Sequence, residues 1–72
     1  MKMVKVFKTD VNDRLVAGSI EFFLRQTLSS CRINFDLDDC DNILRIESHQ
    51  EAVEDEEVRH LLALYGHQCE PL

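Results

Sequence analysis

Two short stretches in the middle of the chain, in which apolar and polar residues alternate, are the feature that most constrains its fold. The stretches are residues 32–36 and 43–48, and the acidic segment 37–42 separates them. Alternation with period two is typical of strands that bury one face. We therefore expect an antiparallel hairpin, in which Ile43 falls on the outer face. The side chains of the hairpin that we expect to point inward are Ile33, Phe35, Leu44 and Ile46.

Segments with helical periodicity flank this hairpin on both sides. Residues 14–29 and 55–65 each carry an apolar stripe with three- and four-residue spacing. Gly18 lies inside the first segment, where glycine costs up to about 1 kcal/mol relative to alanine, so we expect it to permit close packing. Gly66 is typical of a left-handed helix stop. The two predicted stripes are Val16, Ile20, Phe23, Leu24, Thr27 and Leu28, and Val58, Leu61, Leu62 and Tyr65.

The two ends of the chain complete the pattern with one strand each. Residues 3–9 are rich in Val and Phe, and residues 67–72 form a short terminal strand in which Cys69 points inward. Pro71 is tolerated only at an edge or an end of a sheet. The order strand, helix, strand, strand, helix, strand predicts one α+β domain over residues 1–72. Its fold is a ferredoxin-like βαββαβ two-layer sandwich, with a four-stranded antiparallel sheet and two helices on one face.

Composition narrows the range of partners and locations. Fourteen acidic residues face eight basic ones, for a net charge of -6, so nucleic acid is not expected as a partner. The chain has no stretch long and apolar enough for membrane insertion, and its start does not resemble a signal peptide. Three widely spaced cysteines, Cys31, Cys40 and Cys69, form no disulfide framework. We therefore expect a cytoplasmic protein with reduced thiols.

Several local patterns resemble heavy-metal-associated domains of the copper-chaperone type. Residues 9–16 lie where that family carries a GMxCxxC loop between its first strand and first helix. The resemblance extends over nearly the whole chain and implies the same βαββαβ fold. Its other elements are Ile20 and Leu24 of the first helix, the strand at 33–35, the acidic hairpin, the strand at 43–46 and the closing segment 65–71, in which a ring side chain follows Gly66 and Glu-Pro comes near the end.

The metal motif that the resemblance places in this loop is degenerate. Asp13 and Val16 stand at the two cysteine positions, and Asp10 and Val11 stand at the glycine and methionine positions. In the family, paired thiolates near a helix N-terminus bind Cu(I) or Zn(II). Cu(I) prefers sulfur, whereas Asp13 offers a hard oxygen and Val16 offers no ligand. The resemblance therefore implies the fold without the inherited metal site, and we expect no cofactor.

A metal site with other ligands is an alternative prediction. In this fold the first loop, the central hairpin and the loop before the last strand lie at one end of the sheet, which would gather Asp13, Cys40 and His67. Carboxylates of the hairpin could add to a zinc-binding set. The simpler interpretation is that Asp13 caps a helix, Cys40 is a loop residue and His67 lies at the surface. Cys31 belongs near the opposite end of the sheet.

Three functions remain open from the sequence. The first is a protein-interaction or accessory module, whose partner is an unknown protein or a second copy of the chain, since exposed edge strands can pair. The second is a metal-handling protein with non-standard ligands. The third is a small-molecule-sensing regulatory domain that acts as a dimer. Catalysis is not expected, because Cys40 and His67 are the only conceivable nucleophile and base, and no phosphate-binding loop or metal-hydrolase motif occurs.

Overall fold

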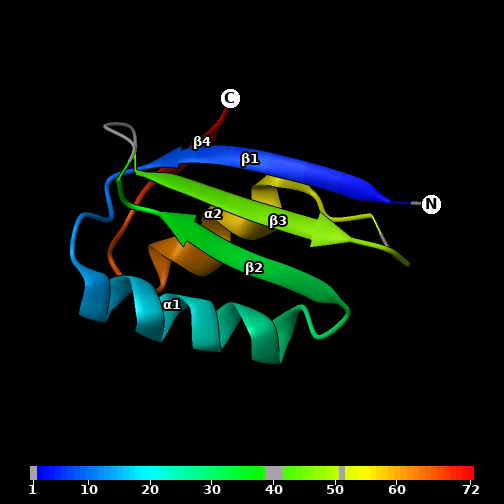
Figure 1. Ribbon diagram of the computed structural model, residues 1–72, viewed down its shortest axis with the longest axis horizontal. Helices are drawn as coiled ribbons and strands as arrows, with labels where there is room; N and C mark the ends of the chain where they lie inside the picture. The colour runs from blue at the N-terminus through cyan, green and yellow to red at the C-terminus, as the bar shows by residue number, and fades with distance from the viewer. Residues whose placement is uncertain (1, 39–41, 51) are drawn as a thin grey trace.

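The computed structural model describes residues 2–38, 42–50 and 52–72, and it has the predicted βαββαβ order. Its four strands form one antiparallel sheet in the order β2-β3-β1-β4. Both helices lie on the same side of this sheet (Figure 1), which confirms the ferredoxin-like α+β fold. The elements are β1 (Met3–Thr9), α1 (Arg14–Thr27), β2 (Cys31–Asp36), β3 (Ile43–Ser48), α2 (Asp55–Ala63) and β4 (Cys69–Pro71).

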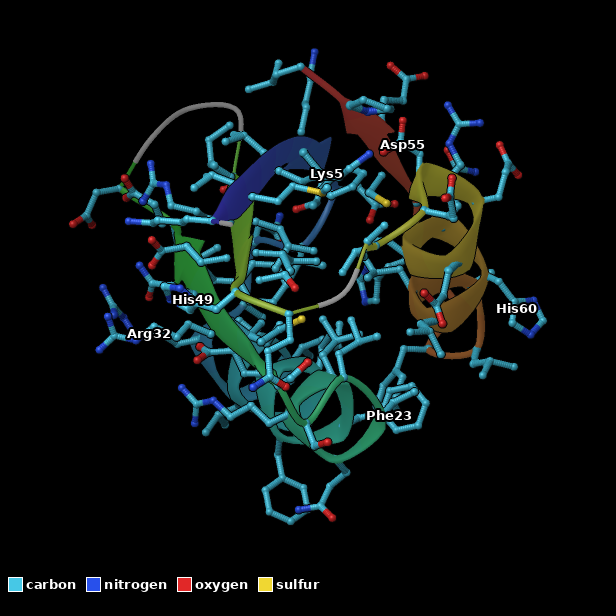
Figure 2. The ribbon with its side chains drawn as sticks, turned by 90° about the vertical axis from the view of Figure 1, so that its right-hand side faces the viewer. Lys5, Phe23, Arg32, His49, Asp55 and His60 are labelled. Carbon is cyan, nitrogen blue, oxygen red and sulfur yellow. The ribbon has the colours of Figure 1, made fainter. Side chains whose placement is uncertain are left out.

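The core lies between the sheet and the two helices. Phe7 of β1 is fully buried there, and Lys5 lies on the same face of the strand. The Lys5 Nζ reaches Oδ1 of Asp55, at the start of α2, over 2.8 Å (Figure 2). The ammonium therefore stays at the edge of the core. The fully or nearly fully buried apolar side chains include Val11, Ile20, Leu24, Leu44, Ile46, Val53, Val58 and Leu62.

Helix α1 is two residues shorter than predicted and packs differently at two positions. It ends at Thr27, whose side chain is exposed and donates a hydrogen bond to the Phe23 carbonyl, so Thr27 is not part of the buried stripe. The prediction that Gly18 permits close packing is wrong. Gly18 is exposed, and a Cβ added there would meet no atom within 4 Å. Ala17, on the adjacent face, is the small residue that the core contacts.

Helix α2 also ends earlier than predicted, at Ala63, because the chain tightens into a turn before Gly66, in which the Tyr65 N–H donates to the Leu62 carbonyl. Gly66 has a φ of 76°, its N–H donates to the Ala63 carbonyl, and the His67 N–H donates to the Leu62 carbonyl. These two bonds make a Schellman motif, which satisfies carbonyls at the helix end. Tyr65 therefore lies past the helix, 41% exposed, with its ring centroid 5.2 Å from that of Phe23.

The sheet follows the predicted register with two refinements. The last strand covers three residues rather than six, and Pro71 ends it on the sheet edge, as expected for a residue without an N–H. Ile43 alternates onto the outer face, yet it is only 5% exposed. Within the part of the chain that the structure describes, no helix has the length and apolar character needed to span a membrane.

Candidate functional site

The corner where β1 passes into α1 is the place at which the resemblance would put a metal. Asp13 is the N-cap of α1, and its Oδ1 accepts the backbone N–H groups of Leu15 at 2.8 Å and Val16 at 3.3 Å. A capping aspartate stabilises a helix by about 1 kcal/mol because it satisfies N–H groups that have no partner within the helix. The interpretation of Asp13 as a cap is therefore confirmed.

The second position of the degenerate motif serves the core. Val16 is half-buried and packs against the core cluster from the first turn of α1. Its aliphatic side chain carries no ligand atom. Both positions at which the resemblance expects thiolates therefore have structural roles, one as a helix cap and the other in packing.

The alternative metal set of Asp13, Cys40 and His67 includes one residue that the structure does not describe. Cys40 lies outside the described residues. His67 contacts Asp10, which the alternative set did not include. Over residues 2–38, 42–50 and 52–72, no group of three or more histidine, cysteine or acidic side chains is arranged to hold an ion.

Asp10 ties the β1–α1 loop to the segment that precedes β4. Its Oδ1 lies 2.9 Å from Nδ1 of His67 and accepts the Gln68 N–H at 3.0 Å. A third bond joins the two segments, since the Asp10 N–H donates to the Gln68 carbonyl at 3.3 Å. The bonds connect residues 57 and 58 positions apart in the chain, so the carboxylate closes the loop at this corner.

Two opposing influences act on the Asp10 carboxyl. Partial burial is the largest and raises its pKa, but it is outweighed by the hydrogen bond from the Gln68 N–H together with the hydrogen bond and charge of His67. The net result is a pKa below the ordinary value of 3.8. Asp10 is therefore ionised at neutral pH, as an acceptor of two hydrogen bonds should be.

Thr9 fastens the same corner to the chain that leads into β3. Its buried hydroxyl donates to the Asn42 carbonyl at 2.6 Å and accepts the Val11 N–H at 3.2 Å. The Thr9 N–H also donates to the Asn42 carbonyl, at 3.2 Å. Polar side chains at the corner thus satisfy backbone groups of three segments, and their bonds hold the loops in place.

A small hollow beside this corner contains a thiol that is poorly suited to chemistry. The hollow has a volume of about 220 Å³. Burial of Cys69 raises the pKa of its thiol to about 11, from an ordinary 9.0. The charge of Arg59 lowers this pKa, and nearby carboxylates raise it by smaller amounts. A thiol of this kind is protonated at neutral pH and is a weak nucleophile and metal ligand. The residues that line the hollow are Lys8, Thr9, Asp10, Gln68, Cys69 and Glu70.

The remaining histidines and the other described cysteine lie away from this corner. His60 points outward from α2 and His49 lies at the opposite side of the molecule (Figure 2). Cys31 is buried at the start of β2, paired with Ser48 at the other end of the sheet, as predicted. None of these residues can join Asp10 and His67.

The second notable feature is the outer edge of β2. Arg25 of α1 donates to the Ile33 carbonyl at 3.4 Å, and the Cys31 N–H donates to the Leu28 carbonyl, so both groups point away from β3. Backbone groups of an antiparallel strand alternate in direction. The N–H and C=O groups of Ile33 and Phe35 therefore face outward, while those of Arg32 and Asn34 face β3.

A hollow follows this edge and is bounded on one side by α1. Its volume is about 470 Å³, and Figure 1 shows α1 running alongside β2. Arg25, which also pairs with Glu21 at 2.9 Å, is the one α1 side chain in its lining. The lining consists of Arg25, Cys31, Arg32, Ile33, Asn34 and Glu47.

The opposite edge of the sheet offers much less backbone. β4 has three residues against six in β2. The Leu72 N–H donates to the Val6 carbonyl beside the Lys8–Glu70 pair, so Cys69 and Pro71 are the β4 residues whose backbone faces outward. Pro71 has no N–H to donate. β2 is therefore the edge of this sheet that can accept a further strand.

Comparison with known proteins gives no match, since no family model, no curated protein and no solved structure is similar enough to this chain to count as a relative. The resemblance to heavy-metal-associated domains stays a prediction. Sequence reasoning missed the Asp10–His67 contact and the outward groups of Ile33 and Phe35. The first had a signal, because both residues were expected in loops at one end of the sheet. The second follows only from the strand order and the ladder.

Proposed function

We propose that this chain is a small non-enzymatic protein-interaction module, similar in fold to a heavy-metal-associated domain that has lost its paired thiolates. We further propose that it binds its partner by accepting an extended strand at the β2 edge. The single observation that carries this proposal is the outward direction of the Ile33 and Phe35 backbone groups along a six-residue edge strand. Strand addition uses such groups for affinity and the alternating side chains for specificity.

The state of the metal-loop corner supports an interaction role over metal handling. Asp13 is engaged as a helix cap, Val16 packs against the core, and Asp10 holds His67 and Gln68. Binding an ion through Asp13 or His67 would cost these contacts. A partner strand at β2 would displace the bond from Arg25 to the Ile33 carbonyl, which would cost little because that bond is long at 3.4 Å.

The contrast between the two edges also supports this proposal. Proteins commonly protect sheet edges by short strands, by proline or by charged side chains. β4 has the first two protections, while β2 has neither and is protected by charged side chains alone, those of Arg32 and Asp36 in the strand and that of Arg25 beside it. The β2 edge, whose bond from Arg25 is easily displaced, is therefore suited to pairing with a partner strand.

A peptide-display selection tests strand addition directly. We expect extended peptides of about six residues, the commonest strand length and that of β2, to be enriched on the immobilised chain. The amides of Ile33 and Phe35 should then become protected from hydrogen exchange, whereas those of Arg32 and Asn34, already directed at β3, should change little.

A backbone substitution provides the control. Cys31 allows the chain to be assembled from residues 1–30 and 31–72 by native ligation, with an N-methyl group on Phe35. This group removes one outward donor and leaves the side chain intact. We expect peptide binding to fall at least tenfold, by loss of a hydrogen bond and by steric conflict. Equal binding by the methylated and unmodified chains would refute strand addition at β2.

A further inference from the structure

The sequence of β2 is complementary to itself when two copies of the strand run antiparallel. Arg32, Asn34 and Asp36 share the outer face of the strand, and Ile33 and Phe35 share the face that is turned to the helices. A basic residue and an acidic residue thus lie at equal distances on either side of Asn34.

We propose that the occupant of the β2 edge is a second copy of this chain, paired antiparallel through β2 about a two-fold axis at Asn34. This inference rests on the proposed function and deepens it by naming the partner. In this register Arg32 faces Asp36 of the second copy, and the reverse contact follows by symmetry. Ile33 faces Phe35 of the second copy, on the side of the helices.

The direction of the β2 backbone N–H and C=O groups allows this register and a few others, and it excludes the rest. Ile33 and Phe35 expose their backbone groups, so each must face a residue that does the same. A pairing centred on Asn34 meets this condition, because it sets Ile33 against Phe35 of the second copy. If one strand shifted by a single residue relative to the other, outward-facing backbone groups of one copy would meet inward-facing groups of the other. The hydrogen bonds between the two strands could then not form.

Charge then distinguishes between the registers that the backbone allows. A pairing centred on Ile33 would set Arg32 against Asn34, and one centred on Phe35 would set Asn34 against Asp36. Only the pairing centred on Asn34 forms two crossed Arg32–Asp36 contacts on the outer face. Opposite charges directly across a strand pair are favourable, and like charges are unfavourable.

Side chains on the inner face also favour closure. Ile33 is 4% exposed, but Phe35 is only half-buried and packs at the margin of the core cluster. A second copy would cover the remaining surface of Phe35 with its own Ile33. The two α1 helices would then run antiparallel across the axis, where Glu21 and Arg25 of each copy offer opposite charges. The result is a continuous eight-stranded sheet with all helices on one face.

Sedimentation equilibrium over a concentration range tests this dimer. We expect reversible association with a Kd of about 10–100 µM, because an interface built on one edge strand is small. Arg32→Glu and Asp36→Arg should each weaken the dimer about tenfold or more, since each turns two attractive contacts into repulsive ones. The double variant Arg32→Glu/Asp36→Arg should restore the Kd to within about threefold, because it re-forms both pairs in the opposite sense.

Matched variants separate this effect from net charge and from misfolding. Arg45→Glu makes the same charge change as Arg32→Glu, but on the outer face of β3, one strand away from the edge, and should leave the Kd within about threefold. Glu47 lies opposite Arg32 within the sheet, so Arg32→Glu is expected to lower stability as well. Asp36→Arg faces Ile43 instead and provides a variant without that conflict. Thermal unfolding of each variant confirms that it is folded.

The outcomes distinguish this inference from the proposed function. A dimer that the double variant rescues supports both. A chain that is monomeric at all concentrations, yet gains protection at the Ile33 and Phe35 amides with a selected peptide, overturns self-pairing and keeps strand addition. A dimer that Arg45→Glu weakens as much as Arg32→Glu does, with no rescue by the double variant, overturns the register centred on Asn34.

Discussion

The Nδ1 of His67 lies 2.9 Å from Oδ1 of Asp10, and the same carboxylate oxygen accepts the backbone N–H of Gln68 at 3.0 Å. One side chain therefore joins the loop before α1 to the loop before β4. Asp10 occupies the position where the resemblance expects the glycine of a metal loop. Its carboxylate serves as a structural latch in this chain, because it bonds to both His67 and Gln68.

Removing this latch should lower stability in proportion to the bonds lost. We expect Asp10→Ala to cost about 1–2 kcal/mol of the free energy of unfolding, since two hydrogen bonds to a charged acceptor disappear. Asp10→Asn keeps an oxygen acceptor and should cost less than half as much. Urea unfolding measures both. Asp38→Ala is the control, because its carboxylate is 92% exposed and lies 3.8 Å from Arg14, so a change within about 0.5 kcal/mol is expected.

The contribution of the Asp10 carboxylate should also appear in the pH dependence of the free energy of unfolding. The pKa of Asp10 is lowered in the folded chain, so its contribution to stability is present above the unfolded value of 3.8 and is lost as pH falls through the folded value. Glu47 has a lowered pKa too, through its hydrogen bond and ion pair with Lys2, and acts over the same range. The difference between wild type and Asp10→Asn therefore isolates Asp10. It should shrink as pH drops below 3.8, and a difference that grows on acidification would contradict the latch.

The two glycines should respond in opposite directions to the same substitution. Gly18→Ala is expected to stabilise the chain by about 0.5–1 kcal/mol, because the residue lies inside α1 with open space around it. Gly66→Ala should destabilise it by about 1 kcal/mol, since φ is 76° there and the Schellman motif needs that conformation. Thermal unfolding of the pair measures both effects. A stabilising Gly66→Ala would show that the helix stop is not as described.

The buried thiol of Cys69 should be almost inert in the native chain. A pKa of about 11 in place of 9.0 leaves about a hundredth of the usual thiolate at pH 8, and burial reduces access further. Alkylation by iodoacetamide in the variant Cys31→Ala/Cys40→Ser reports on Cys69 alone. We expect labelling at least a hundredfold slower in buffer than in urea. Equal rates would mean that β4 does not hold this side chain in the core.

The fold was predictable because its signals are local. Period-two alternation defined β2 and β3, helical stripes defined α1 and α2, and Gly66 marked the second helix stop. The misplaced details depend on long-range packing. Gly18 was expected to have a close neighbour, but that face of α1 meets solvent. Thr27 is exposed although Leu24 and Leu28 are buried, so its side chain lies just outside the stripe that faces the sheet.

The candidate sites were predictable only in part. The Asp13 cap follows from its place before a helix, and it was one of the stated alternatives. The Asp10–His67 contact joins residues 57 positions apart, and its partner choice depends on the rotation of two loops that no short pattern encodes. The direction of the Ile33 backbone groups depends on the pairing partner of β2, so it becomes visible only with the sheet in place.

The central claim is that Asp13 and Val16, at the positions where the resemblance would place soft-metal ligands, serve the fold as a helix cap and in core packing. A Cu(I) titration of the wild-type chain and of Asp13→Cys/Val16→Cys, followed through the amide signals of Asp10, Asp13 and His67, tests it most directly. We predict that the double variant binds one ion and that the wild-type chain shows no saturable shift tighter than about 10 µM. A stoichiometric Cu(I) complex of the wild-type chain at this corner, or a double variant that binds none, would contradict the account.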